Sequence, residues 1–95
     1  MKKSVYIISY GFLEKKGDYT ALYEELSNFE SWWHKIDNTW FVYSDLSAKE
    51  IYAKLKPHLD NNIYLIINIV TQNCYGWLPQ SGWDWMKKYK EVDLS

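Results

Sequence analysis

The sequence predicts a small α+β domain, in which helices pack on one sheet. Two segments, Ser4–Tyr10 and Ile63–Val70, are rich in β-branched and aromatic residues at consecutive positions, as in strands that are buried on both faces. Two other segments repeat apolar residues at the spacing of amphipathic helices. The chain has 95 residues, of which 47% are apolar and 19% aromatic, and this size and composition indicate a single folded domain over residues 1–95.

Capping and periodicity predict the first helix. Asp18 follows a charged loop bracketed by Gly11 and Gly17, and its side chain is expected to cap the helix. The apolar residues of this helix recur at the spacing of one helical face: Tyr19, Leu22, Tyr23, Leu26 and Phe29.

Two strand-like runs, Trp32–Ile36 and Thr39–Ser44, follow the first helix. Asp37 and Asn38 separate them, and both residue types tolerate positive φ. We therefore expect a tight two-residue hairpin or a sharp bend at this point.

The remaining elements complete the order. The segment Ser47–Glu50 is a capping box at the start of a second helix, which Pro57 bends or ends. After the strand Ile63–Val70, the segment Ser81–Asp84 caps a short helix that ends near residues 89–90. The order β-α-β-β-α-β with an added C-terminal helix is that of the ferredoxin-like split βαβ fold.

Charge and cysteine content limit the classes of function. Eleven basic and twelve acidic residues give a net charge of −1, so any nucleic-acid site must be a local patch on a neutral body. Cys74 is the single cysteine, which excludes an intramolecular disulfide and fits a reducing compartment. No stretch approaches the ~20 apolar residues of a membrane span, and Ser4–Leu13 lacks the pattern of a cleaved leader. We therefore expect a cytoplasmic protein with no membrane partner.

The six tryptophans lie in two clusters, within residues 32–40 and 77–85. Strand alternation places about half of the aromatic residues of the hairpin on the face away from the two helices. Two interpretations of this face remain open. It is covered by a second subunit or by the C-terminal helix, or its rings stack on bases or nucleotides while lysines hold phosphates. The second interpretation predicts these ligand-binding residues: Trp33, Lys35, Trp40, Trp77, Trp83, Trp85 and Lys87.

No arrangement of residues predicts catalysis, a cofactor or a bound metal. His34 and Asp37 would face opposite sides of a strand, so we interpret His34 as a packing and hydrogen-bonding residue beside the tryptophans. His58 follows Pro57 and is expected at the surface. Cys74 has no activating neighbour in the sequence, and the four glycines form no phosphate-binding loop.

Five segments resemble a known family: Val5–Tyr10, Ser31–Trp40, Asp45–Ala48, Gly76–Pro79 and Trp83–Trp85. Over nearly the whole chain, the sequence is similar to the SinR-like family of small bacterial and phage proteins. That family is distantly similar to the small CRISPR-associated protein at the dimeric centre of the spacer-acquisition complex, and to VapD-type RNA-cleaving toxins. The resemblance implies a ferredoxin-like homodimer connected with nucleic acid or with phage–host conflict.

One position departs from the pattern of this wider group. Its members end the first strand with an aspartate after a Ser-Tyr pair, and two copies are proposed to hold a divalent metal between them. This sequence has Gly11 at that position. A hard cation needs oxygen ligands, and glycine has no side chain to supply one. The departure disfavours an enzyme of the metal-dependent type.

The expected function is therefore non-catalytic binding of nucleic acid or of a nucleotide by a homodimer, without a cofactor. Three alternatives stay open. The first is a metal-dependent endoribonuclease related to the CRISPR-associated and VapD proteins. The second is sequestration of a nucleotide immune messenger, as a phage protein would do. The third is a protein-interaction module.

Overall fold

A computed structural model describes residues 3–14, 17–71 and 75–89 of the chain. Within these residues it has a four-stranded antiparallel sheet and three α-helices, which confirms the α+β class. The elements in chain order are β1 (Ser4–Phe12), α1 (Thr20–Ser27), β2 (Ser31–Ile36), β3 (Thr39–Ser44), α2 (Ala48–Leu55) with a 3₁₀ turn η1 (Lys56–His58), β4 (Ile63–Ile69) and α3 (Gln80–Tyr89). This order agrees with the order predicted from the sequence.

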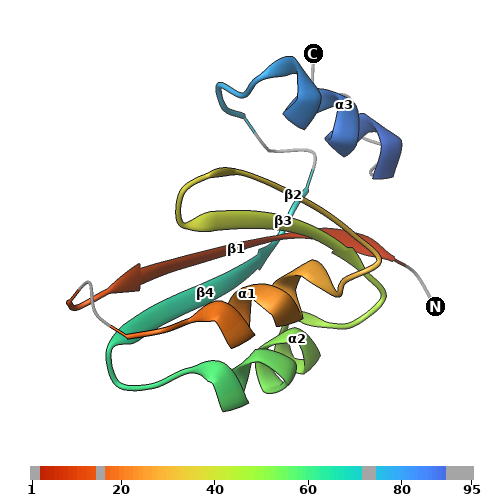
Figure 1. Ribbon diagram of the computed structural model, residues 1–95. Helices are drawn as coiled ribbons and strands as arrows, with labels where there is room; N and C mark the ends of the chain where they lie inside the picture. Colours follow the sequence, from red (N-terminus) through yellow and green to blue (C-terminus); the bar gives the residue numbers. More distant parts are fainter. Residues whose placement is uncertain (1–2, 15–16, 72–74, 90–95) are drawn as a thin grey trace.

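The strands lie in the order β2-β3-β1-β4, so β1 is central and β2 and β4 form the two edges. All neighbours are antiparallel, and β1 pairs with β4 from Tyr6 opposite Ile69 to Phe12 opposite Ile63 without interruption. Helices α1 and α2 lie on one side of the sheet, whereas α3 lies on the opposite side (Figure 1). The sheet therefore has two faces with different cover.

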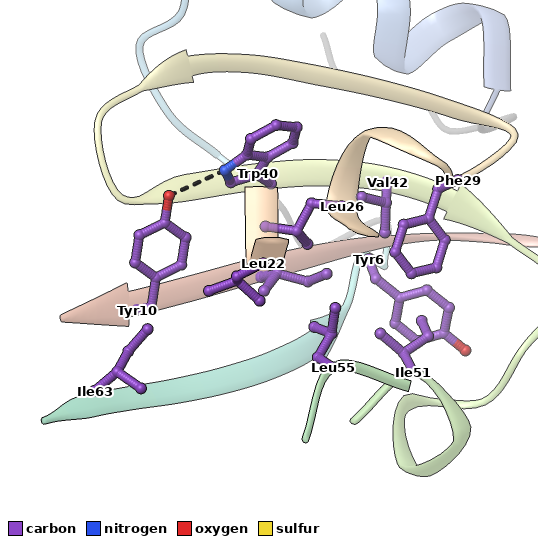
Figure 2. Close-up of a cluster of buried hydrophobic side chains, with 11 residues drawn as sticks. Tyr6, Tyr10, Leu22, Leu26, Phe29, Trp40, Val42, Ile51, Leu55 and Ile63 are labelled. Atoms are coloured by element: carbon purple, nitrogen blue, oxygen red, sulfur yellow. Dashed lines mark hydrogen bonds between the residues drawn. The ribbon is translucent and has the colours of Figure 1, made fainter. Parts of the chain in front are cut away.

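The larger core lies between the sheet and helices α1 and α2. Each helix buries two aliphatic side chains almost completely: Leu22 and Leu26 on α1, and Ile51 and Leu55 on α2. These side chains pack on aromatic and branched residues of the strands. Figure 2 shows this cluster, in which Trp40 of β3 is hydrogen-bonded to Tyr10 of the neighbouring strand β1. Its buried members are Tyr6, Ile8, Tyr10, Leu22, Leu26, Phe29, Trp40, Val42, Ile51, Leu55 and Ile63.

A second, smaller core lies under α3 on the other face. Val5, Trp33, Phe41 and Val70 face Met86 of α3, which has no exposed surface. A Cβ atom added to Gly82 would lie 2.9 Å from Cζ2 of Trp33, so the glycine allows the helix to approach the indole closely.

The helix starts follow the predicted capping chemistry with two corrections. Ser81 does not cap the C-terminal helix, because α3 already begins at Gln80 and Ser81 lies inside it. The capping box is confirmed, because Glu50 N donates to Ser47 Oγ (3.1 Å) and Ser47 N donates to Glu50 Oε1 (2.9 Å). Asp18, however, does not occupy the capping position of α1, which begins at Thr20. Asp18 Oδ1 instead accepts a hydrogen bond from the backbone N–H of Thr20 (2.9 Å), so its side chain closes a turn just before the helix.

The predicted hairpin between β2 and β3 is also present, with two corrections. Asp37 and Asn38 form a two-residue connection, but among the described residues only Gly17 has a positive φ, so the turn does not use the left-handed conformation. The pairing register shifts between Trp33 and Ile36, which places one extra residue in β2. This bulge interrupts the strict alternation predicted from Trp32 through Lys35.

Candidate binding cleft

Of the three hairpin tryptophans, the two that were predicted to bind a ligand, Trp33 and Trp40, point to opposite faces and are both buried. Trp33 is 7% exposed under α3, and its indole N–H donates to Ser81 Oγ (3.3 Å). Trp40 is 5% exposed on the other face, where its indole N–H donates to Tyr10 Oη (3.0 Å). Their ring faces are therefore occupied by protein atoms in this conformation.

The other predicted residues are spread over α3, the segment before it and β2. Trp83 and Trp85 are half-buried on α3. Trp85 donates its indole N–H to Ser31 Oγ (2.9 Å). Lys87 is exposed in the last turn of the same helix. Trp77 is 98% exposed in the segment that precedes α3. Lys35 is exposed on β2.

The structure does not bring the predicted ligand-binding residues together as one site. Trp33, Trp85 and Met86 share the core between the sheet and α3, so the C-terminal helix covers this part of the second face, which is one of the two sequence interpretations. Trp40 belongs to the core on the opposite face.

A cleft of about 400 Å³ lies elsewhere, at the end of the sheet where β1 finishes, α1 begins and the β2–β3 turn is placed. This volume is within the usual range for small-molecule sites. The lining residues combine aromatic rings with carboxylate and amide groups: Phe12, Gly17, Asp18, Tyr19, Tyr23, Asp37 and Asn38.

The aromatic wall of the cleft is held in position by contacts of its rings with one another and with residues outside the cleft. The rings of Phe12 and Tyr19 lie 4.8 Å apart between centroids. The hydroxyl of Tyr19 donates to the carboxylate of Asp60, at 3.0 and 3.1 Å, and accepts from Asn62 Nδ2 (3.1 Å). Tyr23, on the next turn of α1, lies 6.1 Å from Tyr10 between ring centroids. The Tyr19 ring is therefore fixed before any ligand arrives.

The polar side of the cleft is acidic. Asp18 and Asp37 belong to segments far apart in sequence, and both line the same space. Hydrogen bonds from the hydroxyl and the backbone N–H of Thr20 lower the pKa of Asp18 below its ordinary value, so this carboxylate stays charged near neutral pH. The cleft can therefore accept N–H groups or a positive charge at one side while a planar ring lies against the aromatic wall.

Both histidines contact other residues of the domain. His34 stacks on Trp40, with ring centroids 4.1 Å apart and planes inclined by 14°, and its Nε2 lies 2.9 Å from the backbone oxygen of Asp37. This confirms the interpretation of His34 as a packing and hydrogen-bonding residue. His58, expected at the surface, is partly buried with Nε2 3.4 Å from Glu25 Oε1.

The described part of the chain contains no group of three or more His, Cys, Asp or Glu residues placed to hold a metal ion. Gly11, the position where the wider group has an aspartate, lies near the end of β1, and a Cβ atom there would meet no heavy atom within 4 Å. None of the helices in the described ranges is both long and apolar enough to span a membrane. Cys74 lies outside the described residues.

The sequence assigned other roles to the residues of this cleft. Asp18 was interpreted as a helix cap, Asp37 and Asn38 as a turn, and Tyr19 and Tyr23 as part of an apolar helix face. No local sequence signal marks this cleft, because its lining residues come from three separate segments of the chain.

Comparison with known proteins adds no relative to this description. No family model matches the chain, and neither a curated protein nor a solved structure matches it.

Proposed function

We propose that the protein is a non-catalytic homodimer that binds a nucleotide or a nucleic acid, with a base inserted in the cleft between α1 and the β2–β3 turn. The observation that carries this proposal is the combination of a fixed aromatic wall and carboxylates in one space of about 400 Å³. Unpaired bases are recognised in this way, by stacking on rings and by hydrogen bonds to their edges.

The chemistry of the cleft favours a base over an aliphatic ligand. A base stacked on an aromatic side chain gains ~1–3 kcal/mol, whichever base it is. Carboxylates such as those of Asp18 and Asp37 accept hydrogen bonds from exocyclic amino groups and ring N–H groups. Lys35, one of the predicted ligand-binding residues, is exposed two positions before Asp37 and is placed in sequence to contact a phosphate at this end of the molecule.

The same proposal includes the fold family and the relationship inferred from the sequence. The strand order β2-β3-β1-β4, with helices after β1 and β3 on one face, supports a ferredoxin-like split βαβ domain. We also propose the SinR-like relationship, the cytoplasmic location and the absence of metal-dependent catalysis, the last because Gly11 supplies no carboxylate.

Titration of the protein with nucleoside monophosphates and with short single-stranded RNA tests this function. Isothermal calorimetry is expected to detect saturable binding, and Tyr23→Ala is expected to weaken it about tenfold because one stacking ring is lost. Asp37→Asn is expected to change the preference among bases, since an amide both donates and accepts.

Two matched variants serve as controls. Tyr52 is an exposed tyrosine on α2, and Asp45 is an exposed aspartate that does not line the cleft. Tyr52→Ala and Asp45→Asn are expected to bind as the unchanged protein does. Absence of binding to every ligand at millimolar concentration, or equal losses in Tyr23→Ala and Tyr52→Ala, would contradict the proposal.

A further inference from the structure

Strand β4 is an edge strand without the usual protection against pairing. Within the described residues only β1 pairs with it, and that pairing is regular over all seven residues of β4. The strand contains no charged residue, no proline and no glycine. Edge strands of soluble proteins normally carry such residues or a bulge, because an open edge invites pairing with another strand.

The opposite edge of the same sheet is protected. Strand β2 has a register shift between Trp33 and Ile36, and Lys35 places a charge within this irregular stretch. Helix α3 also packs over Trp33. The two edges of one sheet therefore differ, and only β4 presents a regular, uncharged line of backbone groups.

The backbone hydrogen bonds determine which groups of β4 face outward. Leu13 N donates to Asn62 O (2.8 Å), and Val70 N donates to Val5 O (2.8 Å). Asn62 comes just before β4 and Val70 just after it. Because bonded and non-bonded positions alternate in an antiparallel ladder, the even-numbered residues of β4 bond to β1. The odd-numbered residues of β4 therefore direct their N–H and C=O groups away from β1, toward the open edge of the sheet. These residues are Ile63, Leu65, Ile67 and Ile69.

Apolar side chains accompany this edge on both faces. On one face, which α3 does not cover at this point, Tyr64 is 64% exposed and Ile66 is 58% exposed. On the other face, Ile69 is 53% exposed at the end of the strand. A shallow apolar groove lies beside Tyr64 and Ile66, next to Ser9 and Gly11 of β1.

We infer that β4 pairs antiparallel with β4 of a second copy, around a two-fold axis at Ile66. This inference deepens the homodimer of the proposed function by naming its interface. In this register Ile63 lies opposite Ile69 of the partner subunit and Leu65 opposite Ile67 of the partner subunit. All four outward-facing residues of each strand then form backbone hydrogen bonds, and the two sheets become continuous.

The composition of β4 suits this self-pairing. The register places aliphatic side chains opposite aliphatic side chains on one face, and Ile66 opposite its own copy on the other. No like charges meet along the strand, and a net charge of −1 causes little repulsion between whole copies.

The expected affinity follows from the size of the contact. At about 3.3 Å per residue, the seven residues of β4 give a contact roughly 23 Å long. Helix α2 contacts β4 and widens this contact surface by about 10 Å, the diameter of a helix. This gives several hundred Å² per copy, at the lower end of specific interfaces. We therefore expect a dimer that dissociates in the micromolar range.

Sedimentation equilibrium on the full chain, from about 1 to 100 micromolar, tests the interface. Ile66→Lys places two positive charges at the two-fold axis and is expected to weaken dimerisation more than tenfold. Ile36→Lys is the matched control, because Ile36 is an exposed isoleucine of the other edge strand, and it is expected to leave the dimer unchanged.

Cysteine cross-linking tests the register in a Cys74→Ser background. Ile66 lies opposite its own copy at a non-bonded position, where Cα atoms are about 4.5 Å apart, so Ile66→Cys is expected to form a disulfide-linked dimer on oxidation. Tyr64→Cys is expected to form none, because its two copies lie four residues apart along the strands, about 13 Å.

The outcomes separate this inference from the proposed function. A dimer that Ile66→Lys does not weaken, or equal cross-linking of Ile66→Cys and Tyr64→Cys, overturns the β4 interface and leaves the proposed homodimer in place. A wild-type protein that stays monomeric at 100 micromolar overturns both. Nucleotide titration of Ile66→Lys measures base binding independently, because Ile66 does not line the proposed cleft.

Discussion

The indole N–H of Trp40 donates a hydrogen bond of 3.0 Å to the hydroxyl of Tyr10, inside the core between the sheet and the helices. The two residues are 30 positions apart, on the neighbouring strands β3 and β1 (Figure 2). Each residue supplies the polar partner that the other needs when its large ring is buried. The pair therefore joins the two central strands and gives the buried indole N–H an acceptor inside the core.

Replacing Tyr10 with phenylalanine leaves the indole N–H of Trp40 buried without its acceptor. An unsatisfied buried donor costs about 1–3 kcal/mol, so Tyr10→Phe is expected to lower the free energy of unfolding by that amount. Urea unfolding measures the change. Tyr52→Phe removes the hydroxyl of an exposed tyrosine and is expected to stay within about 0.5 kcal/mol of wild type. Equal stabilities of the two variants would refute the structural role of this hydrogen bond.

The same tyrosine predicts how stability depends on pH. Burial raises the pKa of the Tyr10 hydroxyl above its ordinary value. Below pH ~10 the hydroxyl is protonated in the folded and unfolded states, so its contribution to stability is complete. Above that pH the unfolded chain loses the proton first, and the contribution is lost as the pH rises through the folded-state pKa. Unfolding between pH 9 and 11 is expected to show a steeper loss for wild type than for Tyr10→Phe. Parallel curves would contradict this assignment.

Gly82→Ala is expected to destabilise the protein, although alanine normally favours a helix over glycine by about 0.5–1 kcal/mol. The added methyl group would lie 2.9 Å from Cζ2 of Trp33 and 3.2 Å from Leu78 Cδ1. Overpacking of this kind costs about 1–3 kcal/mol, which exceeds the gain in helix propensity. At Gly11 a methyl group meets nothing within 4 Å, so Gly11→Ala is the control and is expected to be neutral or slightly stabilising. A Gly82→Ala protein more stable than wild type would show that α3 does not pack closely on Trp33.

Two adjacent tryptophans of β2 are expected to respond differently to substitution. Trp33 is enclosed between the sheet and α3, and Trp33→Ala is expected to cost about 3–5 kcal/mol of unfolding free energy. Trp32 is partly exposed at the sheet edge against Trp40, and Trp32→Ala is expected to cost less than half as much. Thermal unfolding and nucleotide titration on both variants separate stability from binding. Neither change is expected to alter the affinity of the folded protein, because neither residue lines the cleft. A selective loss of affinity in Trp33→Ala would instead support the stacking role predicted from the sequence.

Much of the fold could be predicted from local patterns. The types and order of the elements follow from periodicity, and the Ser47–Glu50 capping box marks the start of α2 correctly. These signals work because they arise from residues within a few positions of one another. The bulge in β2 was not predictable in this way, since it depends on how the residues after Trp33 fit against Phe41 and Thr39 of β3.

The residues of the candidate cleft were not predicted as a site from the sequence. Tryptophan content indicated that rings would be available for a ligand, but Trp33 and Trp40 each fill a core, on opposite faces. The cleft instead combines the end of β1, the start of α1 and the β2–β3 turn. No local pattern connects Asp18 with Asp37, because only the folding of the chain brings these two segments to the same end of the sheet.

The sequence by itself therefore determined the α+β class, the order of the elements and the fact that the aromatic residues of the hairpin would divide between two faces. Each of these depends on residue type and on spacing along one segment. The tertiary structure alone decided which tryptophans are buried, how far α3 covers the second face and where a cleft opens. Each of these depends on contacts between segments far apart in the chain, and a ring is buried or exposed according to what another segment places on it.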